Sequence, residues 1–428
     1  MTSFAVSSAA NLWQNPARFE TGPAGHDGMG QGLIQGTGDN IDLPGHGSAT
    51  LAQSGRAMSA RFIDATGFFI NYGSIVGRLY PPGNIGPSIE IGSSLATATF
   101  WVVNYGSITG NPTAILHSGG ATDTLIVVNR GTIIGGFYSD GSIFGGYYSG
   151  DSKNSVDIIQ NRGEMIGKVV TGGGDDTVDN RYGSIRFDID MGDGNDRYVA
   201  LDHGSVDGVV YGNGGADTFF GNQTSVERFS GGDGVDTLDF RFGGAVTLAL
   251  DLSFAPGDAA LGDQYIEMEN VFGSDIGDDV IRGDGLANAL FGFGGNDSLD
   301  GAGGNDVLRG GVGIDTLTGG TGNDTFRFSG LDECGDQITD FGNTVGDNDR
   351  FQITAAAFGG GLVAGVLAAS QFQTRTDNLA QDADDRFIFN ITDRTLWFDA
   401  DGNGAGAAIM VADLQAGAVV TAADILLI

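Results

Sequence analysis

A nine-residue phrase repeats between Gly273 and Arg327, and it constrains the fold more than any other feature of the chain. The copies read GSDIGDDVI, GDGLANALF, GFGGNDSLD, GAGGNDVLR, GGVGIDTLT and GGTGNDTFR, with Arg282 as a single interruption. They share the pattern G-G-x-G-x-D-x-U-x, in which U is a large apolar residue. A six-residue turn followed by three strand residues forms half of one coil of a parallel β-solenoid.

Two positions of the phrase carry side chains of constant chemistry. The sixth position holds a carboxylate or an amide, at Asp278, Asn288, Asp297, Asp306, Asp315 and Asp324. The eighth position is predicted to point inward, at Val280, Leu290, Leu299, Leu308, Leu317 and Phe326. Because two copies complete one coil, each sixth-position residue is expected to stack on the next but one, beginning with Asp278 on Asp297.

The stacked carboxylates require a counter-charge. Neighbouring strands lie about 4.8 Å apart, and like charges at such a distance repel by roughly 1 kcal/mol in water and by more where they are shielded. Flexible turns rich in carbonyl oxygens favour Ca²⁺, since Mg²⁺ demands tight octahedral geometry. The alternative is a metal-free turn that caps the solenoid, but such a turn needs no carboxylate at one fixed position. The predicted ligands are therefore the sixth-position side chains and the turn glycines Gly292, Gly294, Gly301, Gly303, Gly310, Gly311, Gly313, Gly319, Gly320 and Gly322.

Similar turns recur upstream at about twice that spacing. Their sixth-position residues are Asp176, Asp196, Asp217 and Asp236, separated by 20, 21 and 19 residues. This spacing predicts one calcium turn per coil from about residue 171. Degenerate copies at 118–126 and 149–157 place Asp123 and Asn154 at the matching position, and we expect those two turns to be free of metal.

A second phrase alternates with these turns and reads NYGSIVG, NYGSITG, NRGTIIG and NRGEMIG, starting at residues 71, 104, 129 and 161. Stacked Asn side chains can hydrogen-bond along a ladder, so this phrase is expected to form the opposite edge of the same solenoid. The chain is accordingly predicted to be all-β. Its expected segments are 1–60, an N-terminal cap or flexible arm; 61–240, a β-solenoid; 241–272, a spacer; 273–327, a β-roll; and 328–428, a small β-rich C-terminal domain.

Composition narrows the classes of partner. The net charge of −34 excludes a basic nucleic-acid surface. The sequence has no run of 18 apolar residues, so no membrane-spanning helix is predicted. A single cysteine, Cys334, allows no internal disulfide, so metal is expected to staple the fold. The first twenty residues lack the charged and apolar regions of a cleaved signal peptide.

The nonapeptides resemble those of the RTX (repeats-in-toxin) calcium-binding proteins of Gram-negative bacteria. The strings DQITDF, DNDRFQI, LWFDADGNG and VTAADILLI, found between residues 336 and 428, are similar to the serralysin-type C-terminal domain that closes many RTX proteins. This resemblance implies export through a type I secretion apparatus, which reads an uncleaved C-terminal signal. It also implies a location outside the cell or at its surface, where Ca²⁺ binding would drive folding.

The sequence contains no catalytic constellation: neither H-E-x-x-H nor G-x-S-x-G occurs, and His117 and His203 are predicted to be exposed. We therefore expect a structural, adhesive or surface-layer role, with cell-surface polysaccharide or further copies of the chain as partners. The alternative is a calcium-stapled β-helix lyase or epimerase acting on an anionic polysaccharide. Candidate contacts for such a sugar are Arg130, Arg162, Arg181 and the aromatic run at 137–148.

Overall fold

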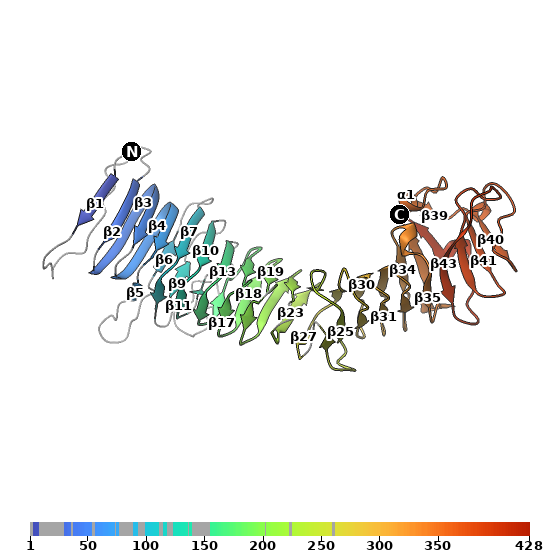
Figure 1. The fold of residues 1–428 in the computed structure, drawn as a ribbon, viewed down its shortest axis with the longest axis horizontal. Helices are drawn as coiled ribbons and strands as arrows, with labels where there is room; N and C mark the ends of the chain where they lie inside the picture. Colours follow the sequence, from blue (N-terminus) through green and yellow to red (C-terminus); the bar gives the residue numbers. More distant parts are fainter. Residues whose placement is uncertain are drawn as a thin grey trace. The chain divides into compact units, whose positions relative to one another are not determined.

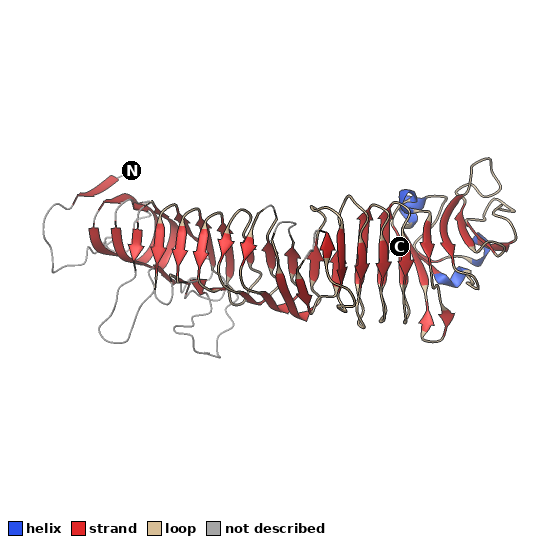
Figure 2. Ribbon diagram, turned by 60° about the horizontal axis from the view of Figure 1, so that its bottom comes forward, coloured by secondary structure: helices blue, strands red, loops and turns tan. Residues whose placement is uncertain are grey.

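The computed structural model describes residues 3–7, 30–35, 37–53, 56–72, 74–76, 89–92, 99–110, 114–117, 123–135, 137–138, 155–201, 203–221, 225–258 and 262–428. The chain divides into two units. Unit 1 comprises Met1–Asp236 and Tyr265–Glu267, and unit 2 comprises Thr237–Gln264 and Met268–Ile428. The regular secondary structure of each unit is almost entirely strand, and most strands pair in parallel, which confirms the predicted all-β solenoid (Figure 2). Within the described chain, no helix is both long enough and apolar enough to cross a membrane.

Each complete coil of unit 1 contributes three strands, so unit 1 has three faces (Figure 1). The first face contains β4 (Arg56–Asn71), β7 (Thr99–Asn104), β10 (Thr124–Asn129), β13 (Val156–Asn161), β16 (Thr177–Asp179), β19 (Arg197–Val199) and β22 (Thr218–Phe220). The second contains β5 (Ser74–Val76), β8 (Ser107–Thr109), β11 (Thr132–Ile134), β14 (Glu164–Ile166), β17 (Ser184–Ile185) and β20 (Ser205–Val206). The third contains β6 (Ile89–Gly92), β9 (Ile115–His117), β12 (Phe137–Tyr138), β15 (Val169–Val170), β18 (Ile189–Asp193), β21 (Val210–Gly215), β23 (Arg228–Gly234) and β27 (Gln264–Ile266).

The predicted N-terminal segment also contains strands. β1 (Ser3–Ser7), β2 (Gly30–Gln35), β3 (Thr37–Gln53) and β4 pair in parallel in chain order. Strand β4 then pairs with β5, β6 and β7 at successive points along its length, so it passes through all three faces. The described part of residues 1–60 therefore forms backbone pairings of the same kind as the solenoid.

The core of unit 1 consists of residues stacked in register. On the first face one column contains Phe69, Val102, Val127, Ile159, Val178, Tyr198 and Phe219, and each is at most 1% exposed. Successive coils bury side chains of similar size at one place because each residue packs on its counterparts above and below. The parallel register thus converts a sequence repeat into a continuous apolar core.

The Asn phrase forms a buried ladder at the corner between the first and second faces. The amide Nδ2 of Asn71 donates to Oδ1 of Asn104, and this pattern continues through Asn129, Asn161 and Asn180 with distances of 2.8, 2.9, 2.8 and 2.8 Å. The ladder was predicted, but its position opposite the aspartate turns was wrong. A coil of three strands has three corners, so the Asn corner follows each first-face strand and the aspartate corner precedes it.

Unit 2 has two strands per coil and therefore two faces. One face contains β24 (Thr237–Asp239), β28 (Asn270–Phe272), β30 (Ala289–Gly294), β32 (Val307–Val312), β34 (Thr325–Phe328), β38 (Arg350–Ile353) and β44 (Ile425–Leu427). The other contains β25 (Val246–Ala249), β29 (Val280–Arg282), β31 (Ser298–Asp300), β33 (Thr316–Thr318), β35 (Asp336–Ile338) and β43 (Ile409–Leu414). Half a coil per nonapeptide, as predicted, is the arrangement found.

The first nonapeptide copy begins one residue later than predicted. Ile281 pairs with Leu299 and is 1% exposed, whereas Val280 is 41% exposed, so the prediction that Val280 points inward was wrong. The first copy runs from Ser274 to Arg282, and Arg282 is its ninth residue rather than an interruption. Alignment on Gly273 placed this copy one residue early because Ser274 occupies the position of its first glycine.

The C-terminal part of unit 2 extends both faces and adds antiparallel strands. β42 (Thr395–Phe398) pairs antiparallel with β43 and with β41 (Phe387–Asn390), which pairs in parallel with β40 (Phe372–Arg375). Short pairs involve β26 (Gly257–Asp258), β36 (Asn343–Thr344), β37 (Asp347–Asn348) and β39 (Gly365–Val366). The described helices are short: α1 (Ala355–Phe358) and the 3-10 helices η2 (Leu331–Glu333), η3 (Ala369–Gln371) and η4 (Ala422–Asp424).

Candidate metal centre

Two columns of buried side chains run along unit 2, at the two edges of the β-roll. One contains Asp279, Asp297, Asp315 and Asp336, and the other contains Asn288, Asp306, Asp324 and Asp349. In each column the backbone N–H of one residue donates to Oδ1 of the next, over 2.7 to 3.1 Å. All eight side chains are at most 3% exposed. The two edges therefore hold carboxylates in register along the stack.

Five of the six sixth-position residues predicted in this region lie in the columns, and Asp278 does not. Asp279 occupies the place beside Asp297, while Asp278 is exposed and its Oδ1 accepts a hydrogen bond from the backbone N–H of Asn296 at 2.7 Å. The expected stacking of Asp278 on Asp297 is thus corrected to Asp279. The cause is the one-residue register error at Ser274.

Sequence reasoning missed Asp336 and Asp349, which extend the columns beyond the nonapeptides. Both are followed, two residues later, by a buried apolar residue, Ile338 or Phe351, as in the D-x-U part of the repeat. They follow the preceding column members by 21 and 25 residues in sequence instead of 18. A search for D-x-U without a fixed spacing would have found them.

One oxygen of each central column carboxylate has no hydrogen-bond partner. Whereas Oδ1 accepts a backbone N–H, Oδ2 of Asp297, Asp306, Asp315 and Asp324 is buried and unpartnered. Leaving a buried polar atom unpaired costs about 1–3 kcal/mol, and more for a charged group. These four Oδ2 atoms therefore require a positively charged partner beside them.

The first glycine of each turn borders the unpartnered oxygen. A methyl group placed on Gly301 would lie 2.3 Å from Oδ2 of Asp306 and 2.5 Å from the carbonyl oxygen of Gly319 in the next coil. On Gly292 it would lie 2.0 Å from Oδ2 of Asp297 and 2.7 Å from the carbonyl oxygen of Gly310. These separations are too short for carbon, so glycine at this position keeps the carboxylate and carbonyl oxygens uncovered, and such oxygens are the ligands that Ca²⁺ prefers. The residues present therefore fit a calcium ion held by carboxylate and carbonyl oxygens.

The remaining predicted glycines shape the turns. Positive φ angles, which favour glycine, occur at Gly311, Gly313, Gly320 and Gly322, and Gly310 and Gly319 each border an aspartate Oδ2. Gly294 and Gly303 do not have positive φ. In their turns the positive angle falls on the preceding residues, Phe293 and Ala302, which stand where the motif has its second glycine.

Asn288 and Asp279 have their oxygens satisfied by protein groups. Nδ2 of Asn288 donates to the carbonyl oxygen of Glu269 at 3.0 Å, and its Oδ1 accepts from the backbone N–H of Asp284. Oδ2 of Asp279 accepts from the backbone N–H of Ser274 at 2.7 Å. The first member of each column is thus hydrogen-bonded to protein groups, and the unpartnered oxygens begin one coil later.

Among the described residues of unit 1 there is one such column, at the corner between its third and first faces. It contains the four predicted residues Asp176, Asp196, Asp217 and Asp236, preceded by Asp157, with N–H to Oδ1 distances of 2.7 or 2.8 Å. Oδ2 of Asp176, Asp196 and Asp217 is buried and unpartnered. Asp157 was missed, although it also precedes a buried apolar residue by two positions, at Ile159. Asn154, for which a metal-free turn was predicted, lies outside the described residues.

Burial raises the pKa of the column carboxyls, and repulsion between neighbouring carboxylates adds to the effect. The pKa rises to about 7 at Asp297 and Asp306, to about 8 at Asp336 and Asp196, and to about 9 at Asp176. A raised carboxyl pKa means that the buried site favours a bound proton when no cation is present. A metal ion and protons therefore compete for the same oxygens.

The columns rely on backbone oxygens as well as side chains. Across the described residues, no three His, Cys, Asp or Glu side chains converge to hold an ion by themselves. Each carboxylate instead faces carbonyl oxygens, an all-oxygen donor set of the type that hard divalent cations prefer. Such a set offers neither a redox centre nor a nucleophile, so the arrangement is suited to binding and stapling.

The sites considered for an enzyme have their charges engaged by neighbours. Arg162 and Arg181 both bind the carboxylate of Asp179, and the guanidinium of Arg130 lies 5.9 Å from the ring centre of Tyr105. Most of the aromatic run at 137–148 lies outside the described residues. A row of guanidinium groups open to an anionic sugar is therefore not seen at these three arginines.

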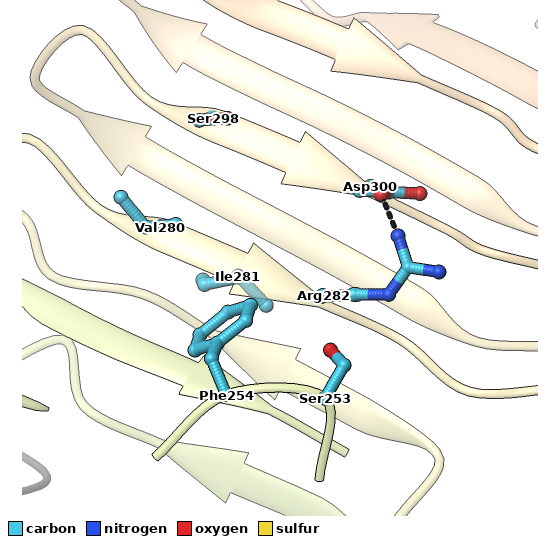
Figure 3. Close-up of a pocket in the computed structure, with 7 residues that line it drawn as sticks. All are labelled: Ser253, Phe254, Val280, Ile281, Arg282, Ser298 and Asp300. Carbon is cyan, nitrogen blue, oxygen red and sulfur yellow. Dashed lines mark hydrogen bonds and ion pairs between the residues drawn. The ribbon is translucent and has the colours of Figure 1, made fainter. Parts of the chain in front are cut away.

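A pocket on unit 2 likewise lacks an available acid or base. Figure 3 shows its lining, which consists of Ser253, Phe254, Val280, Ile281, Arg282, Ser298 and Asp300. Its two ionisable side chains, Arg282 and Asp300, form an ion pair with each other. Arg282 also binds Asp251 at 2.9 Å. The pocket is a hollow between a loop and the surface of the β-roll.

His117 is buried, which corrects the prediction that it is exposed. It is 1% exposed at the end of β9, and its ring lies between the carboxylates of Asp123 and Asp157. Its position at the end of a third-face strand turns the side chain into the aspartate corner instead of outward. His203 is exposed, as predicted, and packs edge-on against Tyr182.

Comparison with protein families identifies the turns. The model of the RTX calcium-binding nonapeptide repeat (4 copies) matches residues 209–223, 274–308 and 300–330. These ranges contain Asp217 of unit 1 and the column residues of unit 2 from Asp279 to Asp324. A search of curated proteins found no match. Together with the unpartnered oxygens, this match shows that the chain carries RTX calcium-binding nonapeptide repeats and binds Ca²⁺ through them.

Proposed function

We propose that this chain is a secreted structural or adhesive RTX protein, at the cell surface or in a surface layer, whose solenoid folds when Ca²⁺ fills its aspartate columns outside the cell. The observation that carries the proposal is the set of buried, unpartnered Oδ2 atoms along unit 2. Without an ion these atoms destabilise the folded state. With an ion they become ligands that join successive coils.

Calcium concentration would then act as the folding signal. Extracellular calcium modules bind with dissociation constants of about 10⁻⁴–10⁻³ M, which leaves the sites empty inside a cell and filled outside. Because the ligands come together only when coils stack, the free energy of binding contributes directly to folding. An acidic chain with empty columns would stay unfolded for export and fold on arrival.

Residues 420–428 support export before folding. Thr421 and Asp424 form a capping box at η4, and the strand β44 that follows buries Ile425 and Leu427, at 0% and 2% exposed. β44 pairs with β38, so the folded roll covers the apolar residues of this segment. A type I secretion apparatus that reads these residues would have to do so while the chain is unfolded.

The outer surface of unit 1 supports a role in adhesion. Tyr72 and Tyr105 follow two successive ladder asparagines and are 55% and 46% exposed. Their rings stack with centres 5.0 Å apart, and Arg130 of the next coil extends the row. Two stacked, exposed aromatic rings with one guanidinium beside them offer a contact surface for cell-surface polysaccharide or for another copy of the chain.

A calcium titration of the full chain tests the proposal. Far-ultraviolet circular dichroism should show little β-structure from unit 2 in chelator and a cooperative gain as Ca²⁺ reaches the millimolar range. Mg²⁺ at equal concentration is the matched control and should have a much smaller effect, because it demands octahedral geometry. Full β-structure in chelator, unchanged by Ca²⁺, would overturn calcium-driven folding. Pull-down on bacterial surface polysaccharide and light scattering of the calcium-loaded chain would then separate adhesion from self-assembly.

A further inference from the structure

His117 links two buried carboxylates of unit 1. Its Nδ1 lies 3.0 Å from Oδ1 of Asp157, and its Nε2 lies 3.1 Å from Oδ2 of Asp123. Asp123 and Asp157 are 2% and 0% exposed. Both ring nitrogens can donate only in the imidazolium, since neutral imidazole has one N–H. The geometry therefore fits a positively charged ring between two negative groups.

The strand register places His117 at the first position of the calcium turn. Tyr138 pairs with Leu116 on one side and with Val170 on the other, so the next residues, His117 and Thr171, occupy equivalent places. The same register continues from Thr171 through Met191 and Gly212 to Gly231. His117 therefore stands where the family-matched turn has Gly212.

The first position borders the ion's place in the column. A methyl group on Gly212 would lie 2.0 Å from Oδ2 of Asp217 and 2.7 Å from the carbonyl oxygen of Gly231. A side chain at Gly212 would therefore extend toward the carboxylate and carbonyl oxygens of adjoining coils. In the His117 coil that space contains the imidazole ring, between Asp123 of its own loop and Asp157 of the following coil.

We propose that His117 supplies the cation of its own coil in unit 1 in place of Ca²⁺. Gly212 leaves the place open for Ca²⁺, whereas His117 fills it with its own imidazolium and ends the calcium column. The statement about Gly212 rests on the proposed function, and the statement about His117 does not.

Two further observations agree with a built-in cation. Burial alone would lower the pKa of His117, but hydrogen bonds to Asp123 and Asp157 outweigh it and raise the pKa to about 9. The coils around His117 also contain the Asn ladder from Asn71 to Asn161, whose amides pair without metal. The ring thus offsets one of the two carboxylate charges at this corner, while Oδ1 of Asp123 and Oδ2 of Asp157 stay buried without a partner. The amide ladder beside it is paired by protein groups alone.

Hydrogen–deuterium exchange with mass spectrometry on the full chain tests the proposal, with chelator and Ca²⁺ compared. In the wild type, backbone amides of β7 to β14 should stay protected in chelator. His117→Gln keeps a side chain of similar size without the charge and should lower this protection at least about tenfold in both conditions, because it leaves two buried carboxylates unpaired. His117→Gly vacates the place between the carboxylates and should lose protection in chelator but regain it in millimolar Ca²⁺.

Controls and failures are distinguishable. His203→Gly, at the exposed histidine, should leave protection unchanged. Wild-type coils without protection in chelator would overturn the proposal, as would a His117→Gln variant that matches the wild type. If His117→Gly does not regain protection in Ca²⁺, the His117→Lys variant, which restores a cation, provides the decisive measurement. Protection of His117→Lys in chelator supports the built-in cation. Loss of protection in His117→Lys refutes it. Loss of all calcium response in unit 2 would refute the proposed function while leaving the chelator result for His117→Gln intact.

Discussion

The backbone N–H of Asp297 donates to Oδ1 of Asp315 at 2.7 Å, while Oδ2 of Asp315 remains buried without a partner. The two oxygens of one carboxylate therefore have separate tasks. Oδ1 fixes the register between coils through the backbone, and Oδ2 faces the place of the ion. Register and metal binding are coupled in each aspartate, so a coil that stacks correctly also completes a calcium site.

Removing one column carboxylate should weaken calcium-driven folding. Asp306→Asn deletes a charge whose Oδ2 is unpartnered, and it should raise the Ca²⁺ midpoint of folding about tenfold, because calcium affinity follows the number of charged ligands. Asp278→Asn is the matched control, since Asp278 is an exposed acid in a neighbouring turn. Circular dichroism across a calcium titration measures both midpoints. Equal shifts for the two variants would contradict the corrected register.

Closing the ion's place without changing any charge should have a similar effect. Gly301→Ala puts a carbon atom 2.3 Å from Oδ2 of Asp306 and 2.5 Å from the carbonyl oxygen of Gly319, so the variant should lose calcium affinity. Gly285→Ala adds the same methyl group where no atom lies within 4 Å, and it should leave the midpoint unchanged. Isothermal titration calorimetry of the two variants gives the stoichiometry. An unchanged stoichiometry in Gly301→Ala would place the ion elsewhere.

The periodic part of the fold was predictable because a solenoid repeats one local solution. In unit 2 the 18-residue period fixed the strands, the inward residues such as Leu299, and the pairs of aspartates in advance. The error at Asp278 arose because the copy at 274–282 begins with Ser274, so glycine spacing alone pointed to the wrong residue. Because Ile281 is buried, it is the eighth residue of this copy, and this assigns the register that the glycine spacing gave wrongly.

Irregular coils were harder to predict because their loops vary in length. Asp336 and Asp349 follow loops that lengthen the spacing to 21 and 25 residues, which a strict period excludes. The three-sided coil of unit 1 was missed because the phrase that starts with Asn was interpreted only as an edge of the solenoid, whereas its later residues form the second-face strands, such as β14. His117 was misjudged for another reason. Its partners Asp123 and Asp157 meet it only through the stacking of coils, 6 and 40 residues away in sequence.

Low pH should partly substitute for Ca²⁺ in stabilising the fold of unit 2. The pKa of Asp297 and Asp306 is raised to about 7 and that of Asp336 to about 8, mainly by burial, above the ordinary value of 3.8. The folded state therefore binds protons that the unfolded state releases. This contribution to stability is fully present below pH 3.8, the unfolded value, and is lost as pH rises through about 7 to 8.

In chelator, unit 2 should consequently be more structured at pH 5 than at pH 8.5, whereas saturating Ca²⁺ should remove most of the difference. Urea denaturation followed by circular dichroism at the two pH values, with and without Ca²⁺, measures this. Asp278→Asn, which removes an exposed acid and leaves the columns intact, is the control and should show the same pH dependence as the wild type. Greater stability at pH 8.5 in chelator would mean that the buried carboxyls are ionised and paired by protein groups.

The Asn ladder should stabilise unit 1 independently of calcium. Asn129 accepts from Nδ2 of Asn104 at 2.9 Å and donates to Oδ1 of Asn161 at 2.8 Å, and it makes two further hydrogen bonds to backbone groups, so Asn129→Ala removes four hydrogen bonds. At about 0.5–1.5 kcal/mol for each bond, unit 1 should lose roughly 2–6 kcal/mol of unfolding free energy. Arg130→Ala, at the exposed neighbour, is the control and should change stability by less than about 1 kcal/mol. Urea unfolding should show the same loss for Asn129→Ala in Ca²⁺ and in chelator, because calcium supplies no substitute for an amide in the ladder. A loss that calcium reverses would mean that the two corners of unit 1 fold as a single calcium-dependent element.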